Sequence, residues 1–587
     1  MAAIKFKKDQ VVIDEIKEFN EKVQAYASGT MDPEEFKHRR LLQGIYGQRQ
    51  PKVFMVRIKI PAGHLSYDMI QGIIDATNLF AQNFVHITTR QDIQIYYVKL
   101  ENLIPLLDKL ADYGITTREA SGATIRNIIT SSFAGSLRSE LFDILPIVEH
   151  LVRYFLRNSE TQHLPRKFKI SVSESEEDLA VSSINDMGLI AKMKDGKPGF
   201  KIMLGGSLGS TPVLSRVYSE FVELNDLFNH VVGIIRTFNR YGDRAKRAEA
   251  RLKFQFEKMG YGRFIELVNK EISLIKEEKV SFPELHAEPV RTADFDFSNP
   301  FNKVTQPDKY NWFNKNVIPT RKENEYMITV QVPNGDLTTA KFQELSEAHK
   351  NWNDNKGEFL TLMDSQNLVL KGIKVTNENK QDHFNNIYKT LSRLDLVRIG
   401  VHTVADVITC MGSATCSSGI THSPGLAEVL QTRLSKYGAE DERFTGSTIH
   451  ISGCANSCAR HHVSTLGFSG RADKSIAVDQ EAPAYNVFIG GSLGADGKGT
   501  IGTKVNEKIL AKRIPEFIET VISIYEKRQK QGEAFQQFIA AMSKEEMNAI
   551  LSEYTIEKRP IQAGEQLNYD WGKEKPYVME YGEGECS

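Results

Sequence analysis

A long internal repeat constrains the fold of this chain more than any other feature. The five residues Gly-Gly-Ser-Leu-Gly follow an apolar run at 205–209, and they return after another apolar run at 490–494, which is 285 residues later. A second pair of similar segments, 54–63 and 326–335, lies 272 residues apart. Solenoid units are only about 20 to 50 residues long, so this spacing is not that of a repeat array. It predicts two fused copies of one larger unit.

The first part of each copy has a β-α-β-α pattern. In copy one, residues 54–60 alternate apolar and polar as a half-buried strand does, and a Pro-x-Gly turn follows. Residues 67–82 show helical spacing, 92–98 predict a second strand, and 103–113 predict an amphipathic helix. This mixture predicts an α+β fold.

The second part of each copy begins near residue 121 or 400 with strand-like apolar runs. It ends in long helical patterns, which cover 213–275 and 509–551. The stretch 285–325 is rich in Pro, Asp, Asn and Lys, and we expect it to be the linker between the copies.

Charge and hydropathy exclude several classes of protein. The 587 residues include 74 Lys and Arg against 75 Asp and Glu, so no overall field draws the chain to nucleic acid or to an anionic membrane. The first ten residues lack the apolar run of a signal peptide, and no stretch approaches the roughly 18 to 20 apolar residues that span a bilayer. We therefore expect a cytoplasmic protein with no nucleic-acid or membrane partner.

The two copies differ mainly in charge and in thiols. Alignment of the copies places Ser131 with Cys410, Arg90 with Ser365, and residues 166–171 with 447–452; it also places Arg251 and Lys253 with Phe535 and Gln537. Copy one is therefore selectively cationic, and the paired cysteines occur only in copy two. If the copies pack about a pseudo-twofold axis, the cations face the thiols across one site, and such a wall suits a multiply anionic ligand.

Four of the five cysteines crowd into two short motifs, Cys410-x5-Cys416 and Cys454-x3-Cys458. Structural zinc sites usually have closer knuckles, so this spacing weakens a zinc assignment without excluding it. Four thiolates also suit a [4Fe–4S] cluster, and the small residues around Gly412 and Gly453 leave room for one. We favour the cluster over zinc, and a metal site over four unliganded buried thiols.

Together these motifs resemble those of the sulfite and nitrite reductase haemoproteins. The resemblance covers roughly residues 40–550 and includes both cysteine motifs, the Gly-Gly-Ser-Leu segments, Thr89-Arg-Gln, Arg126-Asn and Leu164-Pro-Arg-Lys-Phe-Lys169. It implies sirohaem bridged to a [4Fe–4S] cluster, in an internally duplicated α+β fold. Two ferredoxin-like half-domains would form one pseudo-twofold domain beside two related α+β domains that bind sirohaem and the cluster.

The resemblance implies seven segments. They are an N-terminal extension (1–50), the first half-domain (51–120), a sirohaem- and substrate-binding domain (121–284), a linker (285–325), the second half-domain (326–395), a cluster- and sirohaem-binding domain (396–550) and a C-terminal tail (551–587).

The resemblance also assigns site residues. It makes the four paired cysteines the cluster ligands, with Cys458 shared between the cluster and the sirohaem iron. It implies substrate-facing cations at Arg90, Arg126, Lys167 and Lys169, and cofactor-binding residues at Arg166, Arg251, Lys253, Asn456, Cys458 and Arg460. Where the family commonly has Cys-Pro-Asn-Gly-Cys, this chain has Cys-Ala-Asn-Ser-Cys, which keeps both ligands but alters the loop.

Lys169 is the residue that indicates the substrate. Sulfite-reducing members read Lys-Phe-Lys here, as residues 167–169 do, whereas nitrite-reducing members tend to have a neutral residue in place of the second lysine. The resemblance thus implies an assimilatory-type sulfite reductase that takes six electrons from a separate protein, either a ferredoxin or a flavoprotein subunit. Two alternatives stay open: an ammonia-forming nitrite reductase with the same cofactors, and an iron–sulfur electron carrier without sirohaem.

Overall fold

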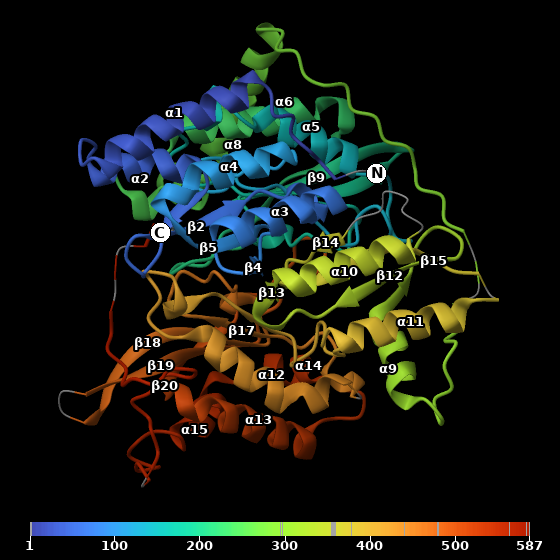
Figure 1. Cartoon of the computed structure of the whole chain (residues 1–587), viewed down its shortest axis with the longest axis vertical. Helices are drawn as coiled ribbons and strands as arrows, with labels where there is room; N and C mark the ends of the chain where they lie inside the picture. Colours follow the sequence, from blue (N-terminus) through green and yellow to red (C-terminus); the bar gives the residue numbers. More distant parts are fainter. Residues whose placement is uncertain are drawn as a thin grey trace.

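The computed structural model of the chain describes residues 3–585, except 294, 296, 354–359, 377, 440, 478–479, 563, 581 and 583. Two helices, α1 (Gln10–Ala27) and α2 (Pro33–Leu42), precede the first sheet (Figure 1). Asp9 and Asp32 cap them by accepting backbone N–H bonds in the first turn. Cys586 lies outside the described residues.

The first half-domain is a five-stranded sheet with the order β1-β2-β5-β4-β13. Its helices are α3 (Tyr67–Phe80) and α4 (Leu103–Asp112). Its own strands are β1 (Ile45–Gly47), β2 (Val53–Ile58), β4 (Phe84–Ile87) and β5 (Ile93–Lys99). The fifth strand, β13 (Asp336–Thr338), comes from the other copy and pairs antiparallel with β4.

The second half-domain repeats this plan with the order β11-β12-β15-β14-β3. Its strands are β11 (Val317–Pro319), β12 (Glu325–Val330), β14 (Leu360–Leu362) and β15 (Leu368–Lys374), and its helices are α10 (Thr339–Trp352) and α11 (Lys380–Arg393). Its fifth strand, β3 (His64–Leu65), comes from the first half-domain. The half-domains therefore exchange a strand in each direction.

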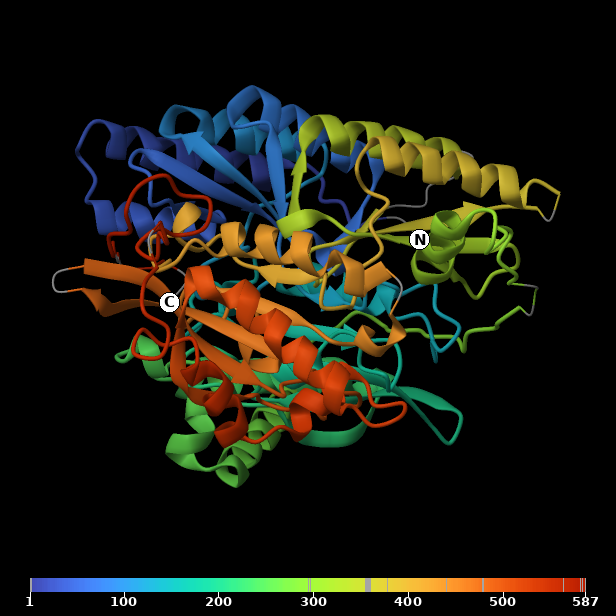
Figure 2. The same cartoon turned by 90° about the horizontal axis from the view of Figure 1, so that it is seen from below.

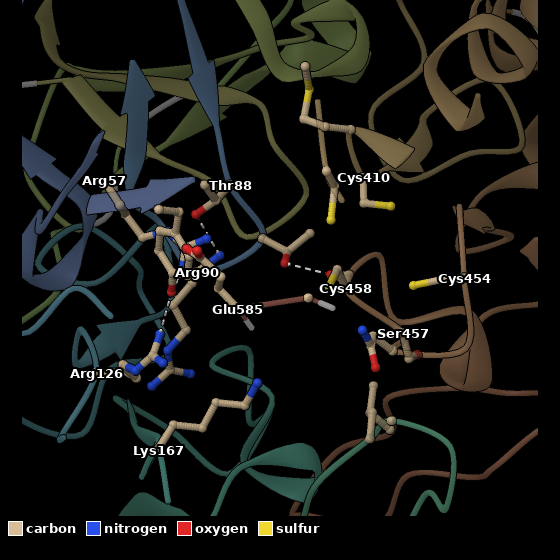
Figure 3. A pocket seen from close by; sticks show the side chains of 18 of the residues that line it. Arg57, Thr88, Arg90, Arg126, Lys167, Cys410, Cys454, Ser457, Cys458 and Glu585 are labelled. Carbon is tan, nitrogen blue, oxygen red and sulfur yellow. Dashed lines mark hydrogen bonds between the residues drawn. The ribbon is translucent and has the colours of Figure 1, made fainter. Parts of the chain in front are cut away.

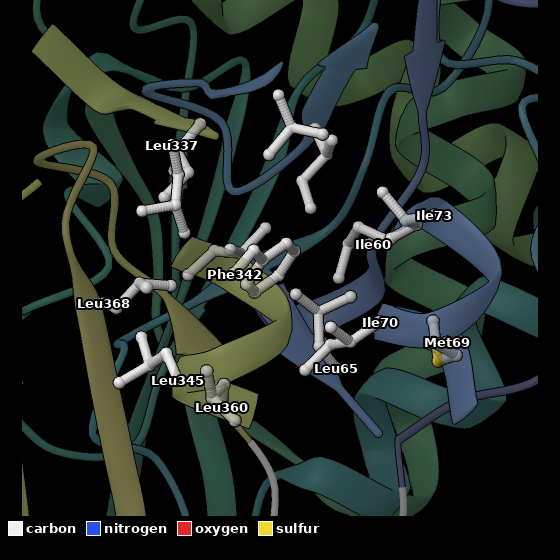
Figure 4. Close-up of a cluster of buried hydrophobic side chains, with 14 of the residues drawn as sticks. Ile60, Leu65, Met69, Ile70, Ile73, Leu337, Phe342, Leu345, Leu360 and Leu368 are labelled. Carbon is white, nitrogen blue, oxygen red and sulfur yellow. The ribbon is translucent and has the colours of Figure 1, made fainter. Parts of the chain in front are cut away.

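One hydrophobic core serves both half-domains. Figure 4 shows Ile60, Leu65 and Ile73 of copy one packed among Leu337, Phe342 and other residues of copy two. These side chains are almost fully buried in the described structure. Because the two copies bury their apolar faces against each other, the pseudo-twofold pair is one packed body.

Each copy also contains a larger α+β domain with the same sheet topology. In copy one the order is β6 (Ile129–Thr130), β7 (Ile170–Ser173), β8 (Met187–Lys194), β9 (Lys197–Leu204) and β10 (Arg216–Glu223). In copy two it is β16 (Val407–Thr409), β17 (Ile449–Ser452), β18 (Leu466–Ala477), β19 (Gln480–Ile489) and β20 (Thr503–Leu510). In both sheets the first three strands run parallel, and the fourth strand pairs antiparallel with the third and with the fifth.

Helices cover these two sheets. They are α5 (Leu145–Phe155), α6 (Leu227–Tyr241), α7 (Leu252–Met259) and α8 (Tyr261–Glu277) in copy one, and α12 (Ser423–Ala439), α13 (Ile514–Arg528), α14 (Phe535–Ala541) and α15 (Lys544–Ser552) in copy two. The copy-two domain, coloured orange to red, lies against both the first half-domain and the copy-one domain (Figures 1 and 2).

Unusual backbone conformations repeat between the copies. Ala62 and Asn334 have φ of 55° and 56° in equivalent turns, and Val181 and Arg460 have φ of 54° and 63° before equivalent short helices. Non-glycine residues rarely adopt this left-handed region, so matched pairs of them mark a duplicated backbone. The predicted α+β class and internal duplication are confirmed.

The structure corrects three details of the sequence prediction. The helical pattern over 213–275 includes β10, an edge strand whose largely exposed side chains leave no clear alternation. The expected linker 285–325 holds α9 (Pro307–Asn316) and β11. Finally, β7 matches β17 at an offset of 279, so Ser173 rather than Ser171 is equivalent to Ser452.

Within the described residues, no helix is both long enough and apolar enough to cross a membrane.

Candidate active site

A cavity of about 690 Å³ lies between the two copies. Figure 3 shows that cationic side chains approach it from copy one and the cysteines from copy two. All of the residues assigned to the site from the sequence line this cavity: Arg90, Arg126, Arg166, Lys167, Lys169, Arg251, Lys253, Cys410, Cys416, Cys454, Asn456, Cys458 and Arg460. The predicted juxtaposition of cations and thiols is therefore present.

Arg90 is fixed by neutral acceptors. It lies just after β4, and its guanidinium donates to Asn185 Oδ1 (2.6 Å) and to the carbonyls of Asn127 (2.7 Å) and Ile170 (2.6 Å). Burial lowers the pKa of Arg90 to about 9. None of these acceptors is charged, although the nearby carboxylates of Asp92 and Asp186 offset part of the charge of the guanidinium.

Arg126 is held in the same way. It donates to the carbonyls of Gly122 (2.8 Å) and Ala120 (3.1 Å), and its Nη1 also lies 3.3 Å from the hydroxyl of Tyr46. Uncharged acceptors, most of them backbone carbonyls, thus hold both arginines at the cavity.

Lys169 is the most strongly perturbed lysine of this wall. Burial, followed by the nearby charges of Arg90 and Arg251, lowers its pKa to about 7. Arg251 itself is held by Asp186 through Nη2–Oδ2 (2.7 Å) and Nε–Oδ1 (3.1 Å) contacts, and Asp186 also accepts the backbone N–H of Lys169 (2.8 Å). Lys253 donates to the carbonyl of Thr211, and burial lowers its pKa to about 8.

Sequence reasoning missed Arg57. This β2 residue lines the cavity, its Nη1 lies 3.2 Å from the Tyr46 hydroxyl, and Tyr46 also contacts Arg126. The signal was available, because the equivalent residue of copy two, 272 positions later, is the neutral Thr329. Arg57 therefore follows the same rule as Arg90: the cation is in copy one and a neutral residue is in copy two.

A carboxylate from the C-terminal segment also reaches the cavity. Glu585 lies among the cations in Figure 3, pairs with Arg40 and accepts the backbone N–H of Gly47 (2.8 Å). Arg40 and a backbone N–H thus hold one carboxylate at the lining of this cavity.

The four thiols form a group on the opposite wall. Burial and the neighbouring Cys458, Cys410 and Cys416 all raise the pKa of the Cys454 thiol, and Gly453 N–H donates to Cys410 Sγ (3.2 Å). Cys454 is buried, Cys410 and Cys416 are half-buried, and Cys458 is exposed. Thr89 of copy one donates to the Cys458 carbonyl (3.0 Å) and so ties the two walls together.

Glycines make room beside the cysteines. A Cβ on Gly419 would lie 2.2 Å from the carbonyl carbon of Gly412, and a Cβ on Gly453 would lie 2.6 Å from Gly412 Cα. Both distances are far below van der Waals contact. Glycine at 419 therefore lets the Cys416 loop fold back on itself, and glycine at 453 lets the two cysteine loops approach this closely.

A single zinc ion and a [4Fe–4S] cluster require different spacings of four thiolates. Among the described residues, no group of three or more His, Cys, Asp or Glu converges on one metal position. A zinc ion needs its thiolates about 2.3 Å from one centre, whereas each cysteine of a [4Fe–4S] cluster binds a different iron and the sulfurs lie further apart.

Both walls of the cavity also contain donors suited to an anionic macrocycle. In the described part of the chain, the buried Nε atoms of Arg90 and Arg460 have no hydrogen-bond partner. Arg460 uses its Nη1 for Asp364 (2.6 Å), which leaves its Nε for another acceptor. Unpaired buried donors are costly, so they mark places where a bound carboxylate or oxyanion fits.

Comparison with known proteins identifies the family. Residues 121–276 and 400–558 match the family described as "Nitrite and sulphite reductase 4Fe-4S domain", and residues 46–113 match the "Nitrite/Sulfite reductase ferredoxin-like half domain". The chain belongs to the nitrite and sulphite reductase family. Members of this family carry sirohaem and a [4Fe–4S] cluster, and the thiols and cations of the cavity fit these two groups.

Individual relatives are distant. The chain is 25% identical over 504 residues to "Sulfite reductase [ferredoxin]" of Mycobacterium tuberculosis, covering 85% of this chain and 84% of the relative. It is 24% identical over 539 residues to "Ferredoxin--nitrite reductase" of Synechococcus elongatus, covering 88% and 95%. The solved structure of the Mycobacterium tuberculosis NirA protein matches with a TM-score of 0.73 and 22% identity over 91% of this chain and 97% of that one, which shows a shared fold.

Proposed function

We propose that this member of the nitrite and sulphite reductase family is an assimilatory-type sulfite reductase that converts sulfite to sulfide. The observation that carries the choice of substrate is Lys169, a partly buried lysine of the cavity whose pKa is lowered to about 7 by burial and by the nearby charges of Arg90 and Arg251. Sulfite brings more negative charge and one more oxygen than nitrite, so an additional ammonium has more charge to neutralise.

The four cysteines would hold the cluster, and the exposed Cys458 is the thiolate best placed to bridge it to sirohaem. When bound, sirohaem and the cluster supply the redox chemistry and pass on electrons that arrive one at a time. Arg166, Arg251, Lys253, Asn456 and Arg460 would bind the carboxylates of the macrocycle. Asp186 keeps Arg251 in place for this task.

Arg90, Arg126, Lys167 and Lys169 would face the substrate, and Arg57 joins them because it shares Tyr46 with Arg126. Each S–O bond that breaks leaves an oxygen that needs two protons to depart as water. An arginine does not give up its proton near neutral pH, but a lysine with a pKa of about 7 can donate one and regain it. Lys169 would therefore act as both an anion-binding group and a proton donor.

We also propose that electrons come from a separate ferredoxin-type protein. Relatives named for ferredoxin include both sulfite and nitrite reductases, whereas one relative is named as the haemoprotein component of an NADPH-dependent enzyme. Reduced ferredoxin is expected to support turnover of the purified protein without a flavoprotein.

Nitrite reduction is the rival reaction, because curated relatives of similar identity are named for it. Substitution of Lys169 by Asn separates the two. We expect kcat/KM for sulfite to fall at least tenfold more than kcat/KM for nitrite, because the variant loses the ammonium that neutralises the larger anion. Equal losses on both substrates would remove the basis for choosing sulfite.

An iron–sulfur electron carrier without sirohaem is the alternative from another class. An anaerobic absorbance spectrum of the purified protein decides between them. We expect a Soret-type band and red bands of an isobacteriochlorin; a spectrum with only the broad cluster absorbance would contradict the proposed function.

A further inference from the structure

A turn of copy one forms hydrogen bonds with the loop that carries Cys416. This turn joins β1 to β2 and contains Arg49 and Gln50. Gln50 Nε2 donates to the carbonyl of Ala414 (2.7 Å), and the backbone N–H of Arg49 donates to the carbonyl of Thr415 (2.8 Å). A segment some 365 residues away in sequence thus fixes the backbone on the N-terminal side of Cys416.

The Arg49 side chain forms further hydrogen bonds with this loop, at Cys416 and beyond it. Its Nε donates to the carbonyl of Cys416 itself (3.3 Å) and its Nη2 to the carbonyl of Gly419. The same guanidinium contacts Glu580 through Nη1–Oε2 (3.2 Å) and Nη2–O (3.0 Å). A guanidinium has five N–H donors in a rigid fork, so one side chain can hold several acceptors at once.

The C-terminal segment also forms hydrogen bonds with this loop. The backbone N–H of Gly582 donates to the Ser417 carbonyl (3.0 Å), and the Tyr577 hydroxyl donates to the Ile420 carbonyl (3.1 Å). These bonds turn the loop carbonyls outward. In a trans peptide the next N–H points the opposite way, and the N–H of Ile420 accordingly donates to the Gly453 carbonyl beside Cys454 (2.8 Å).

The duplication provides a built-in comparison. Arg321 stands 272 residues after Arg49, in the β11–β12 turn, and its N–H donates to the Ser136 carbonyl (2.9 Å), the equivalent of Thr415. There, however, the guanidinium pairs with Glu140 (2.7 Å), a carboxylate whose side chain is only 1% exposed. Copy one has no cysteine loop, and its buried Glu140 carboxylate neutralises Arg321 of copy two.

Arg49 has a different electrostatic environment. Its ion-pair partner Glu580 is 73% exposed, so water screens that carboxylate far more than it screens the buried Glu140. The remaining contacts of the guanidinium are carbonyls of the Cys416 loop. The charge of Arg49 is therefore less neutralised than that of Arg321, and it lies against the carbonyls of the loop that carries Cys416.

We propose that Arg49 is a positioning residue for the cluster, one that fixes the Cys416 loop and raises the reduction potential of the cluster through its positive charge. This inference rests on the proposed function, in which Cys416 binds the cluster. A nearby cation stabilises the form of the cluster that has gained an electron, and hydrogen bonding and local charge are known levers on cluster potentials.

The test is a cluster titration on the purified holoprotein. In Arg49→Gln we expect the cluster midpoint potential, followed by electron paramagnetic resonance, to move to a more negative value. The expected size is at least a tenfold change in the one-electron reduction equilibrium, about 59 mV. Arg49→Lys keeps the charge and should recover most of the shift, although it loses the fork of hydrogen bonds. The matched control is Arg263→Gln, an exposed arginine on α8 that pairs with Glu266.

A second variant covers the case in which Arg49→Gln loses its cluster altogether. Glu580→Gln removes the counter-charge but leaves the bonds of Arg49 to the loop, so the potential should move in the positive direction, by less than the shift in Arg49→Gln because water already screens the exposed carboxylate. If Arg49→Gln keeps its cluster, an unchanged potential in this variant would overturn the inference alone. If Arg49→Gln loses its cluster, an unchanged potential in Glu580→Gln would do so. Wild-type protein without iron and labile sulfide would overturn the proposed function and, with it, this inference.

Discussion

At the scale of single residues, the two copies share one backbone fold but carry different side chains at equivalent positions. Arg57 is equivalent to Thr329, and Arg90 to Ser365, so most cations of the cavity come from copy one, with Arg460 added by copy two. The same holds beside the cysteines: Glu174 of copy one is equivalent to Gly453, because β7 and β17 match at an offset of 279. Where copy two leaves room at Gly453, copy one buries a carboxyl group.

Glu174 makes the stability of the protein depend on pH. Burial raises its pKa from 4.5 to about 7, so between these values the folded protein keeps a proton that the unfolded chain has lost. Stability should therefore fall as pH rises through this window. In Glu174→Gln the change is absent, and relative to the wild type the variant should gain about 2 kcal/mol between pH 5.5 and pH 8. Urea denaturation at both values measures it, with the exposed Glu323→Gln as control. A variant whose stability parallels the wild type at both pH values would contradict the assignment.

At the scale of elements, sequence reasoning succeeded where the pattern is local. The expected segments 54–60, 67–82, 92–98 and 103–113 correspond to β2, α3, β5 and α4 within a few residues. It failed for β3 and β13, which have two and three residues and pair with strands some 250 to 300 positions away. Such short strands carry no periodicity, and only the assembled pair of copies creates their partners.

The site shows the same division. Comparison of the copies found the cations that stand opposite neutral residues, and it could have found Arg57. It could not find Arg49, because an arginine occurs in both copies at this place, and the difference between them lies in what each guanidinium touches. Contacts of this kind between distant segments follow from the tertiary structure alone.

The cysteine loops depend on glycine for their close approach. A Cβ at position 453 would lie 2.6 Å from Gly412 Cα and 2.9 Å from the Thr421 carbonyl, both of which are backbone atoms that cannot swing aside. Gly453→Ala should therefore push the two cysteine motifs apart and lose most of the cluster. Iron and labile sulfide per chain measure the loss.

Gly262→Ala is the matched control, because a Cβ there meets nothing within 4 Å on helix α8. This control should retain its cluster and gain about 0.5 to 1 kcal/mol of stability from the lower flexibility of alanine. A full content of iron and labile sulfide in Gly453→Ala would contradict this prediction, because it would show that the loops accommodate a Cβ at position 453.

At the scale of the whole molecule, neither copy is complete without the other. Each half-domain takes its fifth strand from its twin, one core lies between them, and the cavity draws most of its cations from copy one and its thiols from copy two. Because the copies are fused in one chain, every molecule contains one cationic wall and one cysteine wall, and the two walls stay together. The active site is thus a property of the duplicated molecule and not of either repeat.

Division of the chain between Arg291 and Thr292 tests this dependence. Both residues are exposed, Val290 still bonds to copy one through the Leu141 carbonyl, and Ala293 bonds to copy two through the Arg321 carbonyl. Each half expressed alone should fail to give a cooperative thermal transition, whereas co-expressed halves should purify together and bind iron. Leu337→Asp in the second half places a charge in the buried face of β13 and should prevent this assembly. Two halves that fold independently as stable monomers would contradict the exchange of strands as a requirement for folding.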